Sequence, residues 1–176
     1  MRRTFHTAFA AFFLVAASAH ALTAEEAKAI ASGDTEARVA ALNKAVATAD
    51  DKTSAFIQAM ADDAVKFTED KVFVMKDDKG YDPVTGVELK VPDTAEDVVN
   101  NNMMRGAFDA AQSVLKLVNS KDEAVRLEAA NALLKDPSES RIPMVEKALA
   151  VETNAGIKAK LELVRAASLL NSADKD

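Results

Sequence analysis

Carboxylates, lysines and hydroxyl groups are the side chains through which this chain could do chemistry. It has no cysteine, and both its histidines, His6 and His20, lie in the first 21 residues. If those residues are removed as a secretion signal, neither a Ser-His-Asp nor a Cys-His nucleophile can form, and the usual zinc ligands are missing. Acidic neighbours such as Asp62 and Asp63 point in different directions on a helix. We interpret them as solvated surface charge and expect neither enzymatic activity nor a cofactor.

One acidic segment resembles a calcium-binding loop, with Asp77 and Glu88 at its first and twelfth positions. Two other ligand positions hold Lys79 and Tyr81, and the central glycine that such a loop requires is replaced by Asp82. The pattern favours an ordinary polar loop, and we expect no metal site.

A polar segment near the middle of the chain is the best candidate for recognition. It contains three consecutive asparagines, of which one is expected to cap the following helix, so the run exceeds what a cap needs. Such side chains can hydrogen-bond a partner's backbone or a small polar ligand. The alternative is a polar loop with spare amides. The candidate contact residues are Asp97, Asn100, Asn101, Asn102 and Arg105.

The first 21 residues have the pattern of a secretory signal peptide. Arg2 and Arg3 precede an apolar stretch over residues 5–17, and Ala19 and Ala21 form a small-x-small cleavage site. The apolar stretch is shorter than the roughly 20 residues that a membrane-spanning helix needs. We predict cleavage after Ala21 and export to the periplasm.

The remaining chain is acidic. Removing Arg2 and Arg3 from the 22 basic residues leaves 20, against 28 acidic ones. Nucleic acid and anionic membranes attract clustered lysine and arginine, so both are disfavoured as partners. No run of about 20 apolar residues follows residue 21, so we expect no membrane span in the mature chain.

Apolar residues recur at helical spacing over most of the chain. Thr23 and Glu26 fit a capping box, Gly33 is a stop signal, and Asp34 can cap the next helix. The expected helices run from Thr23 to Gly33 and over residues 34–47, about 53–66, 103–118, 122–134, 142–150 and 155–170.

Two helix starts have matching sequences, SGDTEARV at residues 32–39 and SKDEAVRL at residues 120–127, and residues 154–161 repeat the pattern more loosely. An acidic cap followed by an apolar ridge is typical of HEAT-like repeats. We therefore predict a mainly α fold, an α-solenoid of HEAT-like helical repeats, in which Arg38, Asp122 and Arg126 have structural roles.

A β-rich segment interrupts this pattern. Residues 71–76 and 87–91 alternate in the manner of strands and flank a loop that contains Gly80, Asp82-Pro83 and Gly86, which predicts an inserted hairpin with a long tip. The expected organisation is a signal peptide (1–21), N-terminal helical pairs (22–69), the β-hairpin and Asn-rich loop (70–102) and helical repeats (103–176).

The last expected helix carries many apolar residues and no polar capping repeat, which solenoids normally have. We expect a partner to cover this surface, or the polypeptide to continue, or a disordered tail to follow. The apolar residues are Leu161, Leu163, Val164, Leu169 and Leu170.

The segments of the chain are, in order, a signal peptide, LTAEEAKAIASGD, a helical pair, DKVFVM and DTAEDVVNNNMMRG. In this order of segments the chain resembles the extracytoplasmic N-terminal region of urea-type permeases of branched-chain amino-acid ABC transporters. The resemblance covers almost the whole chain, and its most specific parts are residues 70–74 and 96–102 with Arg105. In that family the region precedes a membrane permease, which works with a second permease, two ATPase subunits and a periplasmic substrate-binding protein. This chain departs from the family because it has no segment that could form the permease.

The resemblance implies a non-catalytic periplasmic interaction domain of a urea-type ABC uptake transporter. Its partners would be the permease and the substrate-binding protein, and it would be attached to the inner membrane through a partner or a permease portion. The alternative is a free-standing periplasmic HEAT-repeat protein that binds a small polar ligand or a protein.

Overall fold

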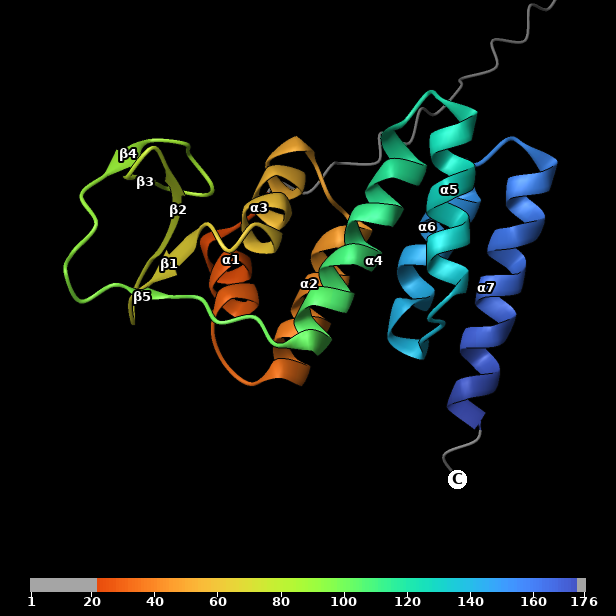
Figure 1. Ribbon diagram of the computed structural model, residues 1–176, viewed down its shortest axis with the longest axis horizontal. Helices are drawn as coiled ribbons and strands as arrows, with labels where there is room; N and C mark the ends of the chain where they lie inside the picture. The colour runs from red at the N-terminus through yellow and green to blue at the C-terminus, as the bar shows by residue number, and fades with distance from the viewer. Residues whose placement is uncertain (1–21, 174–176) are drawn as a thin grey trace, which may run out of the picture.

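Helices form most of the molecule, and a small antiparallel sheet lies at one end of the helical stack (Figure 1). The computed structural model describes residues 22–173, so the predicted cleavage site at Ala19 and Ala21 lies outside the described residues. The elements are α1 (Ala24–Ala31), α2 (Thr35–Ala47), α3 (Asp51–Ala61), β1 (Val65–Phe67), β2 (Val72–Lys76), β3 (Lys79–Tyr81), β4 (Glu88–Leu89), β5 (Glu96–Asp97), α4 (Asn102–Asn119), α5 (Glu123–Leu134), the 3-10 helix η1 (Glu139–Arg141), α6 (Ile142–Val151) and α7 (Ala155–Ala173).

Side-chain caps fix most helix starts, as the sequence predicts. The Thr23 hydroxyl accepts from the Glu26 amide at 3.1 Å, and the Glu26 carboxylate accepts from the Thr23 amide at 3.0 Å. Asp34 caps α2 by accepting from the Ala37 amide, and Asp122 caps α5 by accepting from the Ala124 amide. Each cap satisfies an amide that has no partner within its own helix.

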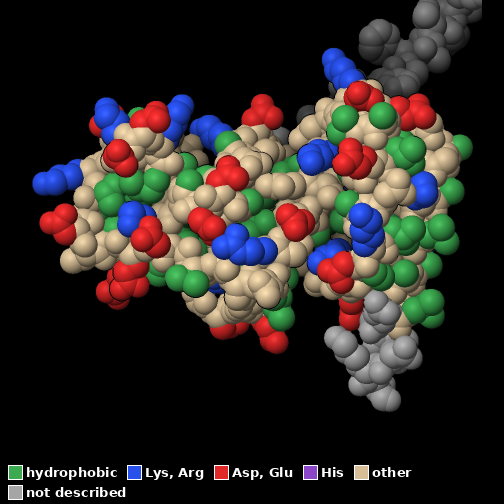
Figure 2. Space-filling view, viewed as in Figure 1, with side chains coloured by type: hydrophobic (Ala, Val, Ile, Leu, Met, Phe, Trp, Pro, Cys, Tyr) green, Lys and Arg blue, Asp and Glu red, His purple; other side chains and the backbone are tan. Residues whose placement is uncertain are grey.

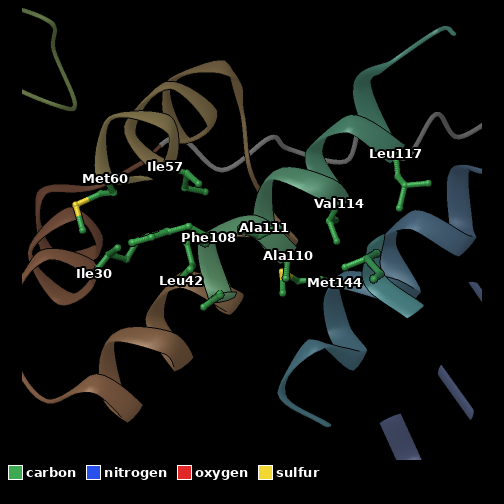
Figure 3. Packing of buried hydrophobic residues seen from close by; sticks show 14 of the residues in the cluster. Ile30, Leu42, Ile57, Met60, Phe108, Ala110, Ala111, Val114, Leu117 and Met144 are labelled. Carbon is green, nitrogen blue, oxygen red and sulfur yellow. The ribbon is translucent and has the colours of Figure 1, made fainter. Parts of the chain in front are cut away.

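Helix α4 lies at the centre of the hydrophobic core and packs against α2, α3, α5 and α6. Phe108 of α4 points toward Ile30 and Met60, whereas Val114 lies nearer the C-terminal helices (Figure 3). Phe108 is 1% exposed and Val114 is fully buried. The regular apolar stripe predicted for this helix is therefore what joins the two ends of the molecule.

The sheet has the order β4-β3-β2-β1-β5, and every neighbouring pair is antiparallel. Val65, Val72 and Val74 lie on the inner face of the sheet and pack into the helical core. The prediction that residues 71–76 pair directly with residues 87–91 is wrong, because β3 lies between β2 and β4. Asp77 and Asp78 adopt positive φ angles of 49° and 61°, which allows a two-residue turn that the sequence pattern did not predict.

The predicted helix over residues 53–66 is also wrong at its end. Helix α3 stops at Ala61, Asp63 has a φ angle of 55°, and β1 follows at Val65. The apolar spacing that includes Phe67 fits both a helix and a strand, and pairing with β2 decides between them. The sheet therefore begins before residue 70, inside the region predicted to be helical.

Candidate functional site

The Asn-rich segment lies where the chain leaves the sheet and enters the helical core. Its first residue, Val98, is buried, and its amide donates to the Val65 carbonyl at 3.0 Å. The segment runs from the end of β5 to the start of α4, along the boundary between sheet and helices (Figure 1). The sequence-predicted contact residues are thus placed at a structural junction.

Asn100 uses all of its amide groups inside the molecule. Its Nδ2 donates to the Met60 carbonyl at 2.9 Å and to the Asp63 carboxylate at 3.0 Å, and its Oδ1 accepts from Arg38 Nη2 at 2.7 Å. The residue is 8% exposed. Asn100 therefore links the end of α3 to α2 and has no amide hydrogen left for a partner.

Arg38 is the buried centre of this junction. Besides Asn100, its guanidinium donates to the Ile30 carbonyl at 2.8 Å and to the Val99 carbonyl at 2.9 Å. All three acceptors are neutral, and burial lowers the pKa of Arg38 from its usual value. The predicted structural role of Arg38 agrees with these contacts, but its hydrogen bonds to the Asn-rich segment were not predicted.

Asn101 and Asn102 differ in the hydrogen bonds of their side chains. Asn101 caps α4 through the Met104 amide at 3.0 Å, and its Nδ2 donates to the Thr35 hydroxyl at 2.8 Å. The predicted asparagine cap is therefore Asn101. Asn102 is exposed, and its side chain makes no hydrogen bond with the described residues.

Asp97 and Arg105 form ion pairs at the surface. Asp97 lies 2.7 Å from Lys66 Nζ on the neighbouring strand, and Arg105 lies 2.9 Å from the second oxygen of Asp63. Hydrogen bonds from Asn100 and then from Arg105 lower the pKa of the Asp63 carboxyl. Asp63 thus joins Asn100 to Arg105, whereas Asp97 lies apart from them on the sheet.

A cleft of about 670 Å³ opens on the outer face of the sheet, away from the helices. Hydrophobic side chains gather there, ringed by basic and acidic ones (Figure 2). Val91 covers Gly80 so closely that a Cβ at residue 80 would lie 2.2 Å from it, which makes a glycine necessary there. The sequence did not predict this cleft, since its walls come from strands that were mispaired. It is lined by Thr68, Asp70, Lys71, Phe73, Leu89, Lys90, Val91, Pro92 and Asp93.

Within residues 22–173, no group of three His, Cys, Asp or Glu side chains is arranged to hold a metal ion. Glu88, at the twelfth position of the loop pattern, lies 2.9 Å from Lys79 Nζ. Among the described helices, none is both long and apolar enough to span a membrane. Comparisons with protein-family models, curated proteins and solved structures gave no match to this chain.

Proposed function

We propose that this chain is a non-catalytic interaction domain of a urea-type ABC uptake transporter, working in the periplasm and contacting the permease and the substrate-binding protein. Its helices would act as a HEAT-like α-solenoid that presents contact surfaces. The resemblance described above supplies the transporter class.

The observation that best supports an interaction domain is the set of exposed leucines on α7. Leu163 is 58% exposed and Leu170 is 69% exposed, and the two lie two helical turns apart. Burying a leucine fully contributes about 1.5–3 kcal/mol, so covering this face by a partner would be favourable. An enzyme would need converging polar groups, whereas a protein contact needs an apolar surface of this kind.

The packing order of the helices supports the solenoid interpretation. Helix α5 packs on α4, and α7 packs on both α5 and α6. In a solenoid each unit covers the apolar ridge of the unit before it, so the outer face of α7 is where a further unit would pack.

The test is a pull-down of the cognate permease complex and the substrate-binding protein with the full chain. We expect the wild type to recover at least one of them and Leu163→Gln/Leu170→Gln to recover much less. Val87→Gln is the matched control, since Val87 is 59% exposed but belongs to the β insert. Recovery of neither partner by the wild type would contradict the proposal.

The cleft on the outer sheet face favours a second candidate, a free-standing binding protein for a small polar ligand. Its volume lies in the range of small-molecule pockets, and Lys71, Lys90, Asp70 and Asp93 place both charge signs at its rim. Calorimetry with urea, simple amides and divalent cations tests this function. A scaffold should give no binding heat with any of them.

A further inference from the structure

Two exposed apolar residues lie next to buried ones in the segment that enters α4. Val99 is 81% exposed between buried Val98 and Asn100, and Met103 is 58% exposed just before the fully buried Met104. Two large apolar side chains therefore face solvent, one three residues before and one directly after the exposed Asn102 in the chain. Single exposed apolar residues are common on protein surfaces, so exposure alone does not indicate a binding surface. The hydrogen bonds that fix the backbone of these residues are the further observation.

The backbone that displays them is fixed from both sides. The Val98 amide donates to the Val65 carbonyl of β1, and the Val99 carbonyl accepts from Arg38 of α2. Asn101 then ties the start of α4 to Thr35. A partner that binds Val99 and Met103 would need to order little further backbone, which removes a main cost of association.

This rigidity requires a buried charge without a counter-charge. The three acceptors of the Arg38 guanidinium are two backbone carbonyls and an amide oxygen. A buried guanidinium destabilises the fold unless its N–H groups are hydrogen-bonded, so the conformation in which the segment supplies the Val99 carbonyl and the Asn100 amide oxygen is favoured. The side chains that remain exposed on the segment after Asp97 are Val99, Asn102 and Met103, apart from the capping Asn101.

The surroundings are acidic. Asp34 and Glu36 flank Thr35, which contacts Asn101, and Asp62 adjoins Asp63 on the other side. The basic side chains of this junction, Lys66 and Arg105, are each paired with a carboxylate. Acidic side chains line the lower edge of the molecule beneath α2 and the start of α4 (Figure 2).

We propose that Val99, Asn102 and Met103, here named the Val99 surface, dock a protein partner that offers an apolar pocket framed by lysine or arginine. This inference rests on the proposed function, for which it names a contact surface. The apolar pair would fill the pocket, Asn102 would hydrogen-bond its rim, and the surrounding carboxylates would face the basic side chains. Asn100, Asn101 and Arg105 would act by positioning this surface.

The test measures binding of the full chain to the immobilised permease complex and, separately, to the substrate-binding protein. We expect Val99→Ser/Met103→Ser to weaken binding to one of them at least about tenfold, as for central interface residues. Added salt should also weaken wild-type binding, because the proposed contact pairs opposite charges. Val87→Ser is the control for a lost exposed valine, and the melting temperature of each variant shows that it is folded.

The outcomes separate the two proposals. If the wild type binds neither partner, the proposed function fails and the Val99 surface fails with it. If the wild type binds and Val99→Ser/Met103→Ser binds equally well, the Val99 surface alone is overturned, and the exposed leucines of α7 remain as the contact. Binding that strengthens with added salt would contradict the basic rim of the partner's pocket.

Discussion

Two segments of closely similar sequence, residues 32–39 and 120–127, form the same local structure in different surroundings. In each, an aspartate caps a helix, and the arginine four residues later reaches back to carbonyls of the preceding chain. Arg38 reaches the Ile30 carbonyl, and Arg126 reaches the Ser120 and Lys121 carbonyls. The shared sequence thus specifies one piece of local geometry twice.

The two arginines differ in the side chain that each one contacts. Arg126 Nε lies 2.9 Å from the buried carboxylate of Glu152, and this contact raises the pKa of Arg126. Arg38 instead donates to the amide oxygen of Asn100, and burial lowers its pKa. The charged pair joins two helices within the C-terminal stack. The neutral contact holds the β insert against the N-terminal helices. The same helix start therefore takes part in two different contacts. The pair Arg126–Glu152 is here named the ion-pair lock, and the hydrogen-bonded contact of Arg38 with Asn100 is named the neutral brace.

Removing Glu152 should have the largest effect. Its Oε2 accepts from Arg126, and its Oε1 accepts from the Thr153 and Asn154 amides at 2.9 and 2.7 Å. We expect Glu152→Ala to lower the free energy of unfolding by about 3 kcal/mol, because it leaves the Arg126 charge without its counter-charge and two amides without acceptors. Urea denaturation measures this, with Glu162→Ala of the exposed pair to Arg165 as control. An equal effect of both variants would contradict the lock.

Removing the amide of Asn100 should cost somewhat less. Asn100→Ala deletes hydrogen bonds to Arg38, Met60 and Asp63, and we expect a loss of about 2 kcal/mol. The neighbouring Asn102→Ala should change stability by less than about 0.5 kcal/mol, as expected for a surface substitution. Denaturation followed by circular dichroism compares the two. Equal losses would show that the brace is not centred on Asn100.

Acid should weaken the ion pair between Arg126 and Glu152 and leave the contact between Arg38 and Asn100, which contains no carboxyl group, intact. Hydrogen bonds from Arg126, followed by those from the Thr153 and Asn154 amides, lower the pKa of Glu152 from its usual 4.5 in the folded state. Its stabilising contribution is therefore complete above pH 4.5 and is lost as the pH falls through the lower, folded value. Melting temperatures measured from neutral to acidic pH should fall less steeply for Glu152→Gln than for the wild type. Parallel curves would refute this assignment.

The smallest effect is expected at the surface pair beside the brace. Arg105→Ala removes an ion pair to Asp63 in which the arginine side chain is 51% exposed. Such pairs contribute about 0.2–1 kcal/mol, and solvent and salt screen them further. Thermal denaturation at low and high salt measures the difference between variant and wild type. A loss as large as that of Asn100→Ala would mean that Arg105 is a main part of the brace.

Caps and helical spacing predicted much of the helical part. Thr23, Asp34 and Asp122 specify their helix starts through their own backbone neighbours, so a single sequence contains the necessary information. The strands were less predictable because pairing depends on distant residues. Lys79 to Tyr81 is a three-residue strand containing Gly80, which looks like a loop until β2 and β4 flank it.

The arrangement of the candidate contact residues could not be predicted from the sequence. The sequence identified the Asn-rich segment, but it could not show that Asn100 faces Arg38, which is 62 residues away. Composition likewise cannot distinguish an amide turned inward from one turned to solvent. Val99 was overlooked because exposure of an apolar residue becomes visible only when its neighbours Val98 and Asn100 are seen to be buried.

The hydrogen bond between Asn100 and the Met60 carbonyl joins residues 40 positions apart, and the sheet lies between them. Once this bond closes the loop, the entropy of closure changes only slowly with the number of residues enclosed, by about 0.6 kcal/mol for each doubling. The loop between β3 and β4, over residues 82–87, can therefore vary in length while the helical frame keeps its geometry. In evolutionary terms, the outer part of the insert can be lengthened or shortened, whereas β1 and β2, whose valines pack into the helical core, must keep their place.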